Sequence, residues 1–327
     1  MTPVKHPYVA LEKVPPAQDL IYVLWTASGV CNQKCSYCHP RFHDGKTSFP
    51  EINKVIGFLQ HLLDSNPEKR LYLVFSGGEP TLWKDIGPFL TFCREQERLI
   101  LELDSNGSRH LNWWKENLDS INFLVLSYHW EFANQDRFIE LLQVAGPSIP
   151  VHVSILALPE FFEQSRRLMD TIQELAPECS VKAKAVRLAM GAENYPYTLE
   201  QKNWLLKHGS RHPRTPIHPI PLDLSKHIVQ RSADGHIKAF NRSTASLLRQ
   251  NRWKGWKCFA GIESFSIDVD GSIYRATCRV GGSIGNLHEE VIFPRQPVIC
   301  DKDNCVCLDD IWISKRLPEV RSSGEQE

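Results

Sequence analysis

The sequence predicts an α/β protein built around a parallel sheet, and three observations lead to this class. Over the first 190 residues, short apolar runs alternate with segments whose apolar residues recur at helical spacing. Alternation of this kind implies right-handed βαβ units. Glycine, cysteine and polar residues cluster directly after several of the runs. Because sites on parallel barrels lie at the carboxyl ends of strands, we expect these clusters to come together.

Six strands are expected, at 21–25, 71–75, 99–103, 121–126, 151–156 and 181–188. The helices between them are expected at 51–64, from 85 onward, at 113–118, through 138–142 and at 160–175. Pro50 suits the start of a helix, and Asp85 is a suitable N-cap. Asp-Gly pairs at 234–235 and 270–271 predict hairpins. A further helix is expected at about 243–251.

The overall composition argues against several classes of protein. The 327 residues include 38 Lys and Arg against 38 Asp and Glu, so no general affinity for nucleic acid or anionic membrane is expected. No run approaches the ~20 apolar residues of a membrane span. The polar N-terminus does not resemble a signal peptide. Ten cysteines without an export signal favour metal binding in the reducing cytoplasm, where we expect this protein.

Three cysteines follow the first apolar run, as Cys31-x3-Cys35-x2-Cys38 with Tyr37 before the last. They place three thiolates on one loop, one fewer than a four-iron cluster needs, so one iron is left open. Zinc is an alternative, but it requires a fourth ligand, and His39 follows Cys38 too directly to reach the same ion easily. A disulfide is disfavoured because no secretory signal is present. The triad therefore predicts a cluster with an open iron.

This loop resembles that of the radical S-adenosylmethionine (radical SAM) family, which has the same spacing and an aromatic residue before the third cysteine. The resemblance implies a partial (β/α)6 TIM-like barrel over about the first 190 residues. It also implies that the open iron binds the amino and carboxylate groups of S-adenosylmethionine (SAM). Tyr37 then takes the position of a residue that lies near the SAM adenine, or its ring covers the cluster.

A second motif, Ser76-Gly77-Gly78-Glu79-Pro80, directly follows the second strand. Paired glycines let the main chain approach a ligand closely, although an ordinary glycine turn is the alternative. Because the motif lies one βα unit after the cysteine loop, it resembles the GGEP motif of the radical SAM family. The resemblance implies that Gly77, Gly78, Glu79 and Pro80 bind the SAM amino group.

Four further residues are candidates for SAM binding. Ser105 and Asn106 lie in the segment 104–107 after the third strand, which resembles the family's Thr-Asn-Gly element; an Asn-Gly turn is the alternative. Ser127 ends the fourth strand and Arg137 lies in the next helix. In relatives, residues so placed contact the SAM ribose and carboxylate, and a guanidinium suits a carboxylate. Arg137 is otherwise a solvated charge on a helix.

Five of the ten cysteines lie in the last quarter of the chain, at Cys258, Cys278, Cys300, Cys305 and Cys307. The hairpin at 270–271 is expected to bring the first two together, and the others are able to fold over the same site. This arrangement resembles the twitch and SPASM auxiliary-cluster domains of radical SAM enzymes, although a full SPASM domain has more cysteines. The resemblance implies one auxiliary [4Fe–4S] cluster, and four cysteines holding structural zinc are the alternative.

We therefore expect a radical SAM barrel at 1–190, a bridging segment at 191–255 and a small cysteine-rich α+β auxiliary-cluster domain at 256–327. The resemblance implies that SAM is cleaved reductively to a 5′-deoxyadenosyl radical, which abstracts hydrogen from a substrate. It also implies a flavodoxin- or ferredoxin-type electron donor. We expect a small-molecule substrate, because only about 20 residues precede the first strand and peptide-modifying relatives often carry a leader-binding domain. The alternatives are a SPASM-class peptide or protein maturase and a non-catalytic cysteine-rich metal-binding protein.

Overall fold

The computed structural model describes residues 6–188, 193–209, 227–240, 245, 250–305, 307 and 309–318. The chain forms two compact units, and each is described by itself. The barrel unit comprises residues 23–221 and 267–271. The C-terminal unit comprises residues 1–22, 222–266 and 272–327. None of the described helices is both long and apolar enough to span a membrane.

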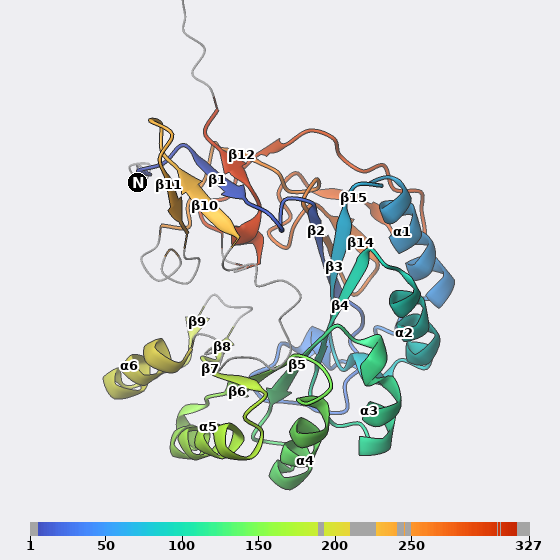
Figure 1. The fold of residues 1–327 in the computed structure, drawn as a ribbon, viewed down its shortest axis with the longest axis vertical. Coiled ribbons are helices and arrows are strands. Elements are labelled where there is room, and N and C mark those ends of the chain that lie inside the picture. Colours follow the sequence, from blue (N-terminus) through green and yellow to red (C-terminus); the bar gives the residue numbers. More distant parts are fainter. Residues whose placement is uncertain are drawn as a thin grey trace, which may run out of the picture. The chain divides into compact units, whose positions relative to one another are not determined.

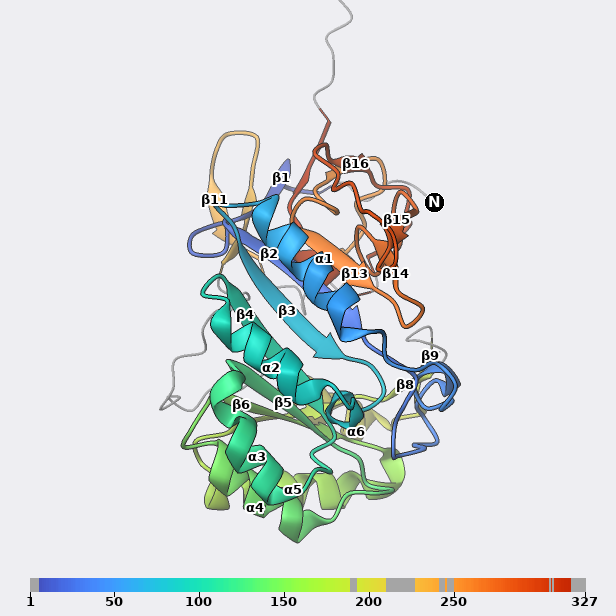
Figure 2. The same ribbon diagram turned by 90° about the vertical axis from the view of Figure 1, so that its right-hand side faces the viewer.

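The barrel unit is built on a curved sheet with helices along its outer face (Figures 1 and 2). Strands β3 to β7 pair in parallel in chain order, and β2 adjoins β3. This order confirms the α/β class. The strands are β2 (Leu20–Thr26), β3 (Arg70–Ser76), β4 (Leu99–Ser105), β5 (Phe123–Tyr128), β6 (Val151–Leu156) and β7 (Ser180–Lys184).

Four of the expected helices bury the apolar faces that their residue spacing predicts, and the helix Leu199–His208 was not expected. In α1, for example, the buried residues are Val55, Phe58, Leu59, Leu62 and Leu63. Asp85 precedes α2 but its side chain makes no capping hydrogen bond. The helices are α1 (Ile52–Asp64), α2 (Ile86–Glu95), α3 (Leu111–Asn117), α4 (Gln135–Ala145), α5 (Phe162–Leu175) and α6 (Leu199–His208).

The strand expected at 181–188 is shorter in the structure than in the prediction. It ends at Lys184, and Arg187–Leu188 (β8) pairs instead with Glu193–Asn194 (β9). The break has a physical cause in the Tyr197 hydroxyl, which accepts a hydrogen bond from the Val186 amide and donates one to the Ala157 carbonyl. A side chain thus satisfies the main chain where a neighbouring strand otherwise would.

The C-terminal unit contains a second sheet that the sequence did not predict in full. Its strand order is β11-β10-β1-β17-β12-β16, and β1 pairs antiparallel with β10 and β17. The first residues of the chain therefore belong to this unit rather than to the barrel expected at 1–190. The strands are β1 (Ala10–Lys13), β10 (Ile228–Arg231), β11 (Ile237–Ala239), β12 (Lys257–Cys258), β16 (Val298–Ile299) and β17 (Lys315–Arg316).

Both expected hairpins form. The turn at 234–235 joins β10 to β11, and Gly235 has a φ of 88°. The turn at 270–271 joins β13 (Ser264–Ile267) to β14 (Ser272–Tyr274), and β14 pairs on with β15 (Ser283–Asn286). Gly271 has a φ of 78°, which favours glycine. Most of the helix expected at 243–251 and part of the expected bridging segment lie outside the described residues.

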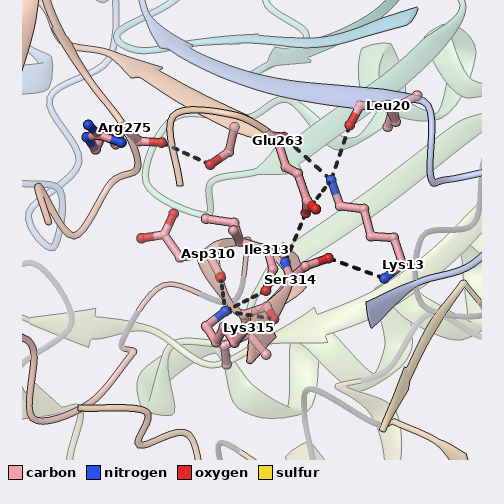
Figure 3. A network of polar contacts seen from close by, with 10 residues as sticks. Lys13, Leu20, Glu263, Arg275, Asp310, Ile313, Ser314 and Lys315 are labelled. Atoms are coloured by element: carbon pink, nitrogen blue, oxygen red, sulfur yellow. Dashed lines mark hydrogen bonds and ion pairs between the residues drawn. The ribbon is translucent and has the colours of Figure 1, made fainter. Parts of the chain in front are cut away.

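A buried ion pair joins the N-terminal strand of the C-terminal unit to its later segments (Figure 3). The Lys13 ammonium lies 3.3 Å from a carboxylate oxygen of Glu263 and donates to the Leu20 carbonyl at 3.2 Å. The same Glu263 carboxylate accepts from the Ser314 amide at 2.9 Å. Lys13 is only 8% exposed. Each of the two charged groups is therefore stabilised by the other.

Replacing Lys13 with Met is expected to lower the free energy of unfolding by about 2 kcal/mol, because the mostly buried Glu263 carboxylate loses its counter-charge. The double variant K13M/E263M should recover part of that loss. The control is Lys254→Met, which breaks an exposed pair with Asp303 and should change stability little. Denaturant unfolding of the three variants measures these differences. Equal losses for K13M and K254M would contradict the assignment.

Candidate functional site

The cysteine loop of the barrel unit is anchored to the end of β3. The Gly78 amide donates to the Ser28 carbonyl at 2.9 Å, and the Glu79 amide donates to the Val30 carbonyl at 2.7 Å. A Cβ at Gly78 would lie 2.1 Å from the Val30 carbonyl oxygen, and Gly77 has a φ of 129°. Both glycines are therefore required by the contact between two protein segments, before any ligand is considered.

The Glu79 carboxylate is fully buried and ties the end of β3 to the end of β4. It accepts four hydrogen bonds, from the Thr81 amide and hydroxyl, the Ser105 hydroxyl at 2.8 Å and the Asn106 amide at 2.7 Å. Burial raises the pKa of Glu79, and these hydrogen bonds act in the opposite direction. The side chains of Glu79 and Ser105 are thus engaged within the protein, while Pro80 begins a 3-10 helix (Pro80–Leu82). Their roles in SAM binding stay predictions.

The turn after β4 reaches the cysteine loop. Gly107 has a φ of 72°, so the Asn-Gly turn that the sequence offered as an alternative is present. The Asn106 amide group donates to the Asn32 side chain at 3.0 Å and lies 4.0 Å from the Cys31 sulfur. The Asn32 amide group in turn donates to the Ser108 hydroxyl. The turn therefore holds Asn106 against the cysteine loop.

The loop after β5 supplies a third anchor. The Glu131 carboxylate accepts hydrogen bonds from the Ser36 amide, at 2.8 Å, and from the Ser36 hydroxyl. The Tyr37 hydroxyl lies 2.7 Å from Nδ1 of His129, and the two rings stack. The cysteine loop is thus bound at the ends of β3, β4 and β5. This confirms the expectation that residues at the strand ends come together.

The three thiols of this loop interact electrostatically with one another. Burial raises the pKa of Cys35 to about 11, and the neighbouring Cys38 and Cys31 charges add to the rise. Burial also raises the pKa of Cys31 and that of Cys38. Within the described part of the chain, no three His, Cys, Asp or Glu side chains are placed to hold a single metal ion. A four-iron cluster makes a different demand, because each thiolate binds its own iron, and three clustered soft thiolates fit it.

Tyr37 and His129 are both neutral near pH 7. Burial raises the pKa of Tyr37 far above its usual range, so its hydroxyl stays protonated. Burial lowers the pKa of His129 to about 4, assisted by the charge of Lys184 and opposed by that of Glu131. The histidine tautomer sets which of the two groups donates, and the hydrogen bond holds the Tyr37 ring beside the loop.

The remaining candidate SAM-binding residues differ in burial and do not all line the same cavity. Ser127 is half-buried near the end of β5, whereas Arg137 is exposed in the first turn of α4. Arg137 and Asn106 line a cavity of about 510 Å³ between the loops that follow β4 and β5. Gln33 of the cysteine loop also lines it. Tyr37 and Ser127 are not among its lining residues, so this cavity brings together only part of the predicted set.

The distal cysteines of the C-terminal unit gather around one small enclosed cavity. Its lining includes four of the five, namely Cys258, Cys278, Cys300 and Cys305. Cys307 is not part of this lining, and its thiol donates to the Asp309 carboxylate at 3.8 Å. Burial raises the pKa of Cys278 to about 12 and that of Cys305 well above its usual range. Four soft donors around one cavity fit a fully ligated four-iron cluster.

The two remaining cysteines, Cys93 and Cys179, are both buried. Cys93 is buried in the apolar face of α2, and the buried Cys179 thiol donates to the Leu142 carbonyl. The sequence analysis assigned no role to Glu131, which anchors the loop, or to His129, because a polar residue a few positions before a helix has no distinctive spacing.

Known proteins resemble this chain mainly over the barrel. The family model "Radical SAM superfamily" matches residues 25–172. The GTP 3′,8-cyclase of Photorhabdus laumondii is 28% identical over 142 residues, which cover 39% of this chain and 41% of that protein. The GTP 3′,8-cyclase of Pasteurella multocida is 30% identical over 112 residues, which cover 32% of each chain. The chain therefore spans about two fifths or less of these curated relatives.

One solved structure resembles more of the chain. The structure described as "Native anSMEcpe with bound AdoMet" has a TM-score of 0.56 and covers 84% of this chain and 79% of its own. Its sequence is 15% identical, so the likeness concerns the fold. The coverage extends beyond the residues matched by the family model.

Gly78→Ala is expected to unfold or strongly destabilise the cysteine loop, because the added methyl group meets the Val30 carbonyl oxygen. Both the melting temperature and the iron content after anaerobic reconstitution should fall. Gly87→Ala, in α2, is the matched control, since a Cβ there meets nothing within 4 Å. That helix substitution should be neutral or stabilising by about 0.5 kcal/mol. A G78A protein with unchanged melting temperature and iron content would refute the role of this contact.

His129→Gln is expected to flatten the dependence of stability on acidic pH. The folded-state pKa of about 4 lies below the ordinary value of 6.5, so the unfolded chain binds more protons between these values. Stability contributed by neutral His129 is therefore present above pH ~6.5 and is lost as the pH falls towards 4. The difference in melting temperature between pH 7 and pH 5 should shrink by on the order of 2 °C. The exposed His236→Gln is the control and should leave that difference unchanged.

Proposed function

We propose that this chain, whose residues 25–172 match the radical SAM family model, cleaves SAM reductively at a [4Fe–4S] cluster held by Cys31, Cys35 and Cys38. The observation that carries the proposal is the anchoring of the loop that bears these three cysteines at three successive strand ends. When bound, the cluster supplies one electron to SAM, which splits into methionine and a 5′-deoxyadenosyl radical. The hydrogen abstraction that follows requires no general base, so the role of the protein is to position SAM and the substrate and to exclude water.

The residues around the loop have separate tasks in this proposal. Glu79 holds the ends of β3 and β4 at a fixed distance, and Asn106 supports the segment next to Cys31. Because the Glu79 carboxylate is already satisfied, the main chain of Gly77 and Gly78 is what remains to bind the SAM amino group. Tyr37, fixed by His129, covers the cluster and excludes water. Ser127 and Arg137 are proposed contacts of the ribose and the carboxylate.

An auxiliary [4Fe–4S] cluster is the second part of the proposal. Its ligands are Cys258, Cys278, Cys300 and Cys305, since these four line the enclosed cavity, and Cys307 is the spare. Full ligation by protein leaves no iron open for substrate, so this cluster serves electron transfer rather than substrate binding. Structural zinc is the competing occupant, and metal analysis distinguishes the two.

We propose a small molecule as the substrate. The relatives named GTP 3′,8-cyclase act, by that name, on a nucleotide, which is a small molecule. These relatives align with too little of this chain for us to propose a nucleotide as its substrate. A flavodoxin- or ferredoxin-type protein is the proposed electron donor. A cytoplasmic setting is also proposed, because the reducing cytoplasm keeps thiols available as metal ligands.

After anaerobic reconstitution with iron and sulfide, the full chain is expected to hold about eight irons, as two four-iron clusters. With dithionite and SAM it should form 5′-deoxyadenosine and methionine. The variant C31A/C35A/C38A should keep about four irons and lose SAM cleavage, because only the auxiliary cluster remains. Cys307→Ala is the matched control and should keep both properties.

The outcomes separate the alternatives. Iron near zero in C31A/C35A/C38A would refute the auxiliary cluster. Bound zinc in place of iron at the distal cysteines would favour the structural metal. A full chain that neither holds iron nor cleaves SAM would favour the non-catalytic metal-binding protein.

A further inference from the structure

A buried lysine lies beside the distal cysteines. Lys315 in β17 is the register partner of Cys258 in β12, and residues directly opposite in an antiparallel pair point to the same face. Lys315 is 1% exposed and lines the same cavity as the four cysteines. A charged side chain so deeply buried requires compensation.

The Lys315 ammonium donates all its hydrogen bonds to uncharged main-chain carbonyls (Figure 3). Nζ donates to the carbonyls of Asp310 at 2.9 Å, Ile311 at 3.3 Å and Ile313 at 2.8 Å. An ammonium has three N–H donors, so these carbonyls use its capacity fully. Nζ also lies 4.6 Å from the centre of the Trp253 ring. Lys315 is therefore held in one place and donates to no thiol.

The charge of Lys315 is not balanced by a direct ion pair. Among the described residues, no carboxylate lies within 4.0 Å of its Nζ, whereas Lys13, the other buried lysine of this unit, has Glu263 at 3.3 Å. The Asp310 carboxylate points away from the Lys315 ammonium (Figure 3). It accepts from the Thr277 hydroxyl and from the Cys278 amide at 2.8 Å. Asp310 thus positions a cysteine with its side chain and the lysine with its carbonyl. The charge of Lys315 interacts at longer range with Asp310 and with the thiols of Cys258 and Cys305, which line the same cavity.

We propose that Lys315 is the positioning residue that compensates the negative charge of the auxiliary cluster and raises its reduction potential. The inference rests on the proposed auxiliary cluster. A cluster with four thiolates carries net negative charge, and reduction makes that charge more negative. A fixed cation in a dry cavity stabilises the reduced form more than the oxidised form, since net charge and burial both tune cluster potentials.

The test uses the C31A/C35A/C38A protein, in which the auxiliary cluster is the remaining iron site. Lys315→Met and Lys315→Gln remove the charge, Lys315→Arg keeps it, and Lys238→Met removes an exposed charge of β11 as the control. Redox titration followed by electron paramagnetic resonance measures the potential. At a fixed poise, K315M and K315Q should show at least a tenfold lower ratio of reduced to oxidised cluster, about 59 mV for one electron. K315R and K238M should stay near the parent.

Each other outcome has a defined meaning. Loaded K315M or K315Q with an unchanged potential overturns the inference. Neutral variants that keep the apoprotein melting temperature but load no iron support it, because the cation is then needed to hold the anion. Neutral variants whose apoprotein is unfolded, while K315R is folded but has a shifted potential, overturn it in favour of a purely structural lysine. A parent protein without iron refutes the auxiliary cluster itself.

Discussion

The barrel site depends on one buried carboxylate. Glu79 accepts four hydrogen bonds from residues on the loops that follow two neighbouring strands. Its own amide binds the main chain of the cysteine loop at Val30. A single residue therefore fixes the relative position of three segments that are far apart in sequence. This arrangement also positions the thiols of Cys31, Cys35 and Cys38, since the segment that carries them has no regular secondary structure of its own.

Most of the barrel was predictable because its signals are local. Apolar runs mark the buried strands, helical spacing marks the covering helices, and the glycines at 77–78 and 107 mark turns that only glycine adopts easily. The cysteine spacing likewise predicts a four-iron cluster. The hydrogen bonds of the Glu79 carboxylate were not predicted. The motif predicts a contact with SAM, which stays a prediction, and gives no sign of these protein donors.

The features that escaped prediction depend on distant partners. Strand β1 is recognisable only through β10 and β17, and Lys13 meets Ser314 across 301 positions in sequence. Glu131 acquires its role from Ser36, and Lys315 from the register with Cys258. In the sequence, Lys315 next to Arg316 looks like an ordinary exposed basic pair. Only the tertiary structure shows that Lys315 is buried and that Arg316 lies at the surface.

The pairing of β1 with β17 has a consequence for biosynthesis. Strand β17 is made long after β1, so β1 must wait until the barrel strands have been made before it can pair with β17. The barrel strands, by contrast, find their neighbours within one βα unit and are able to assemble as they emerge. Because β12 pairs with β17 at Cys258 and Lys315, the cavity lined by Cys258, Cys278, Cys300 and Cys305 can close only after β17 has been made.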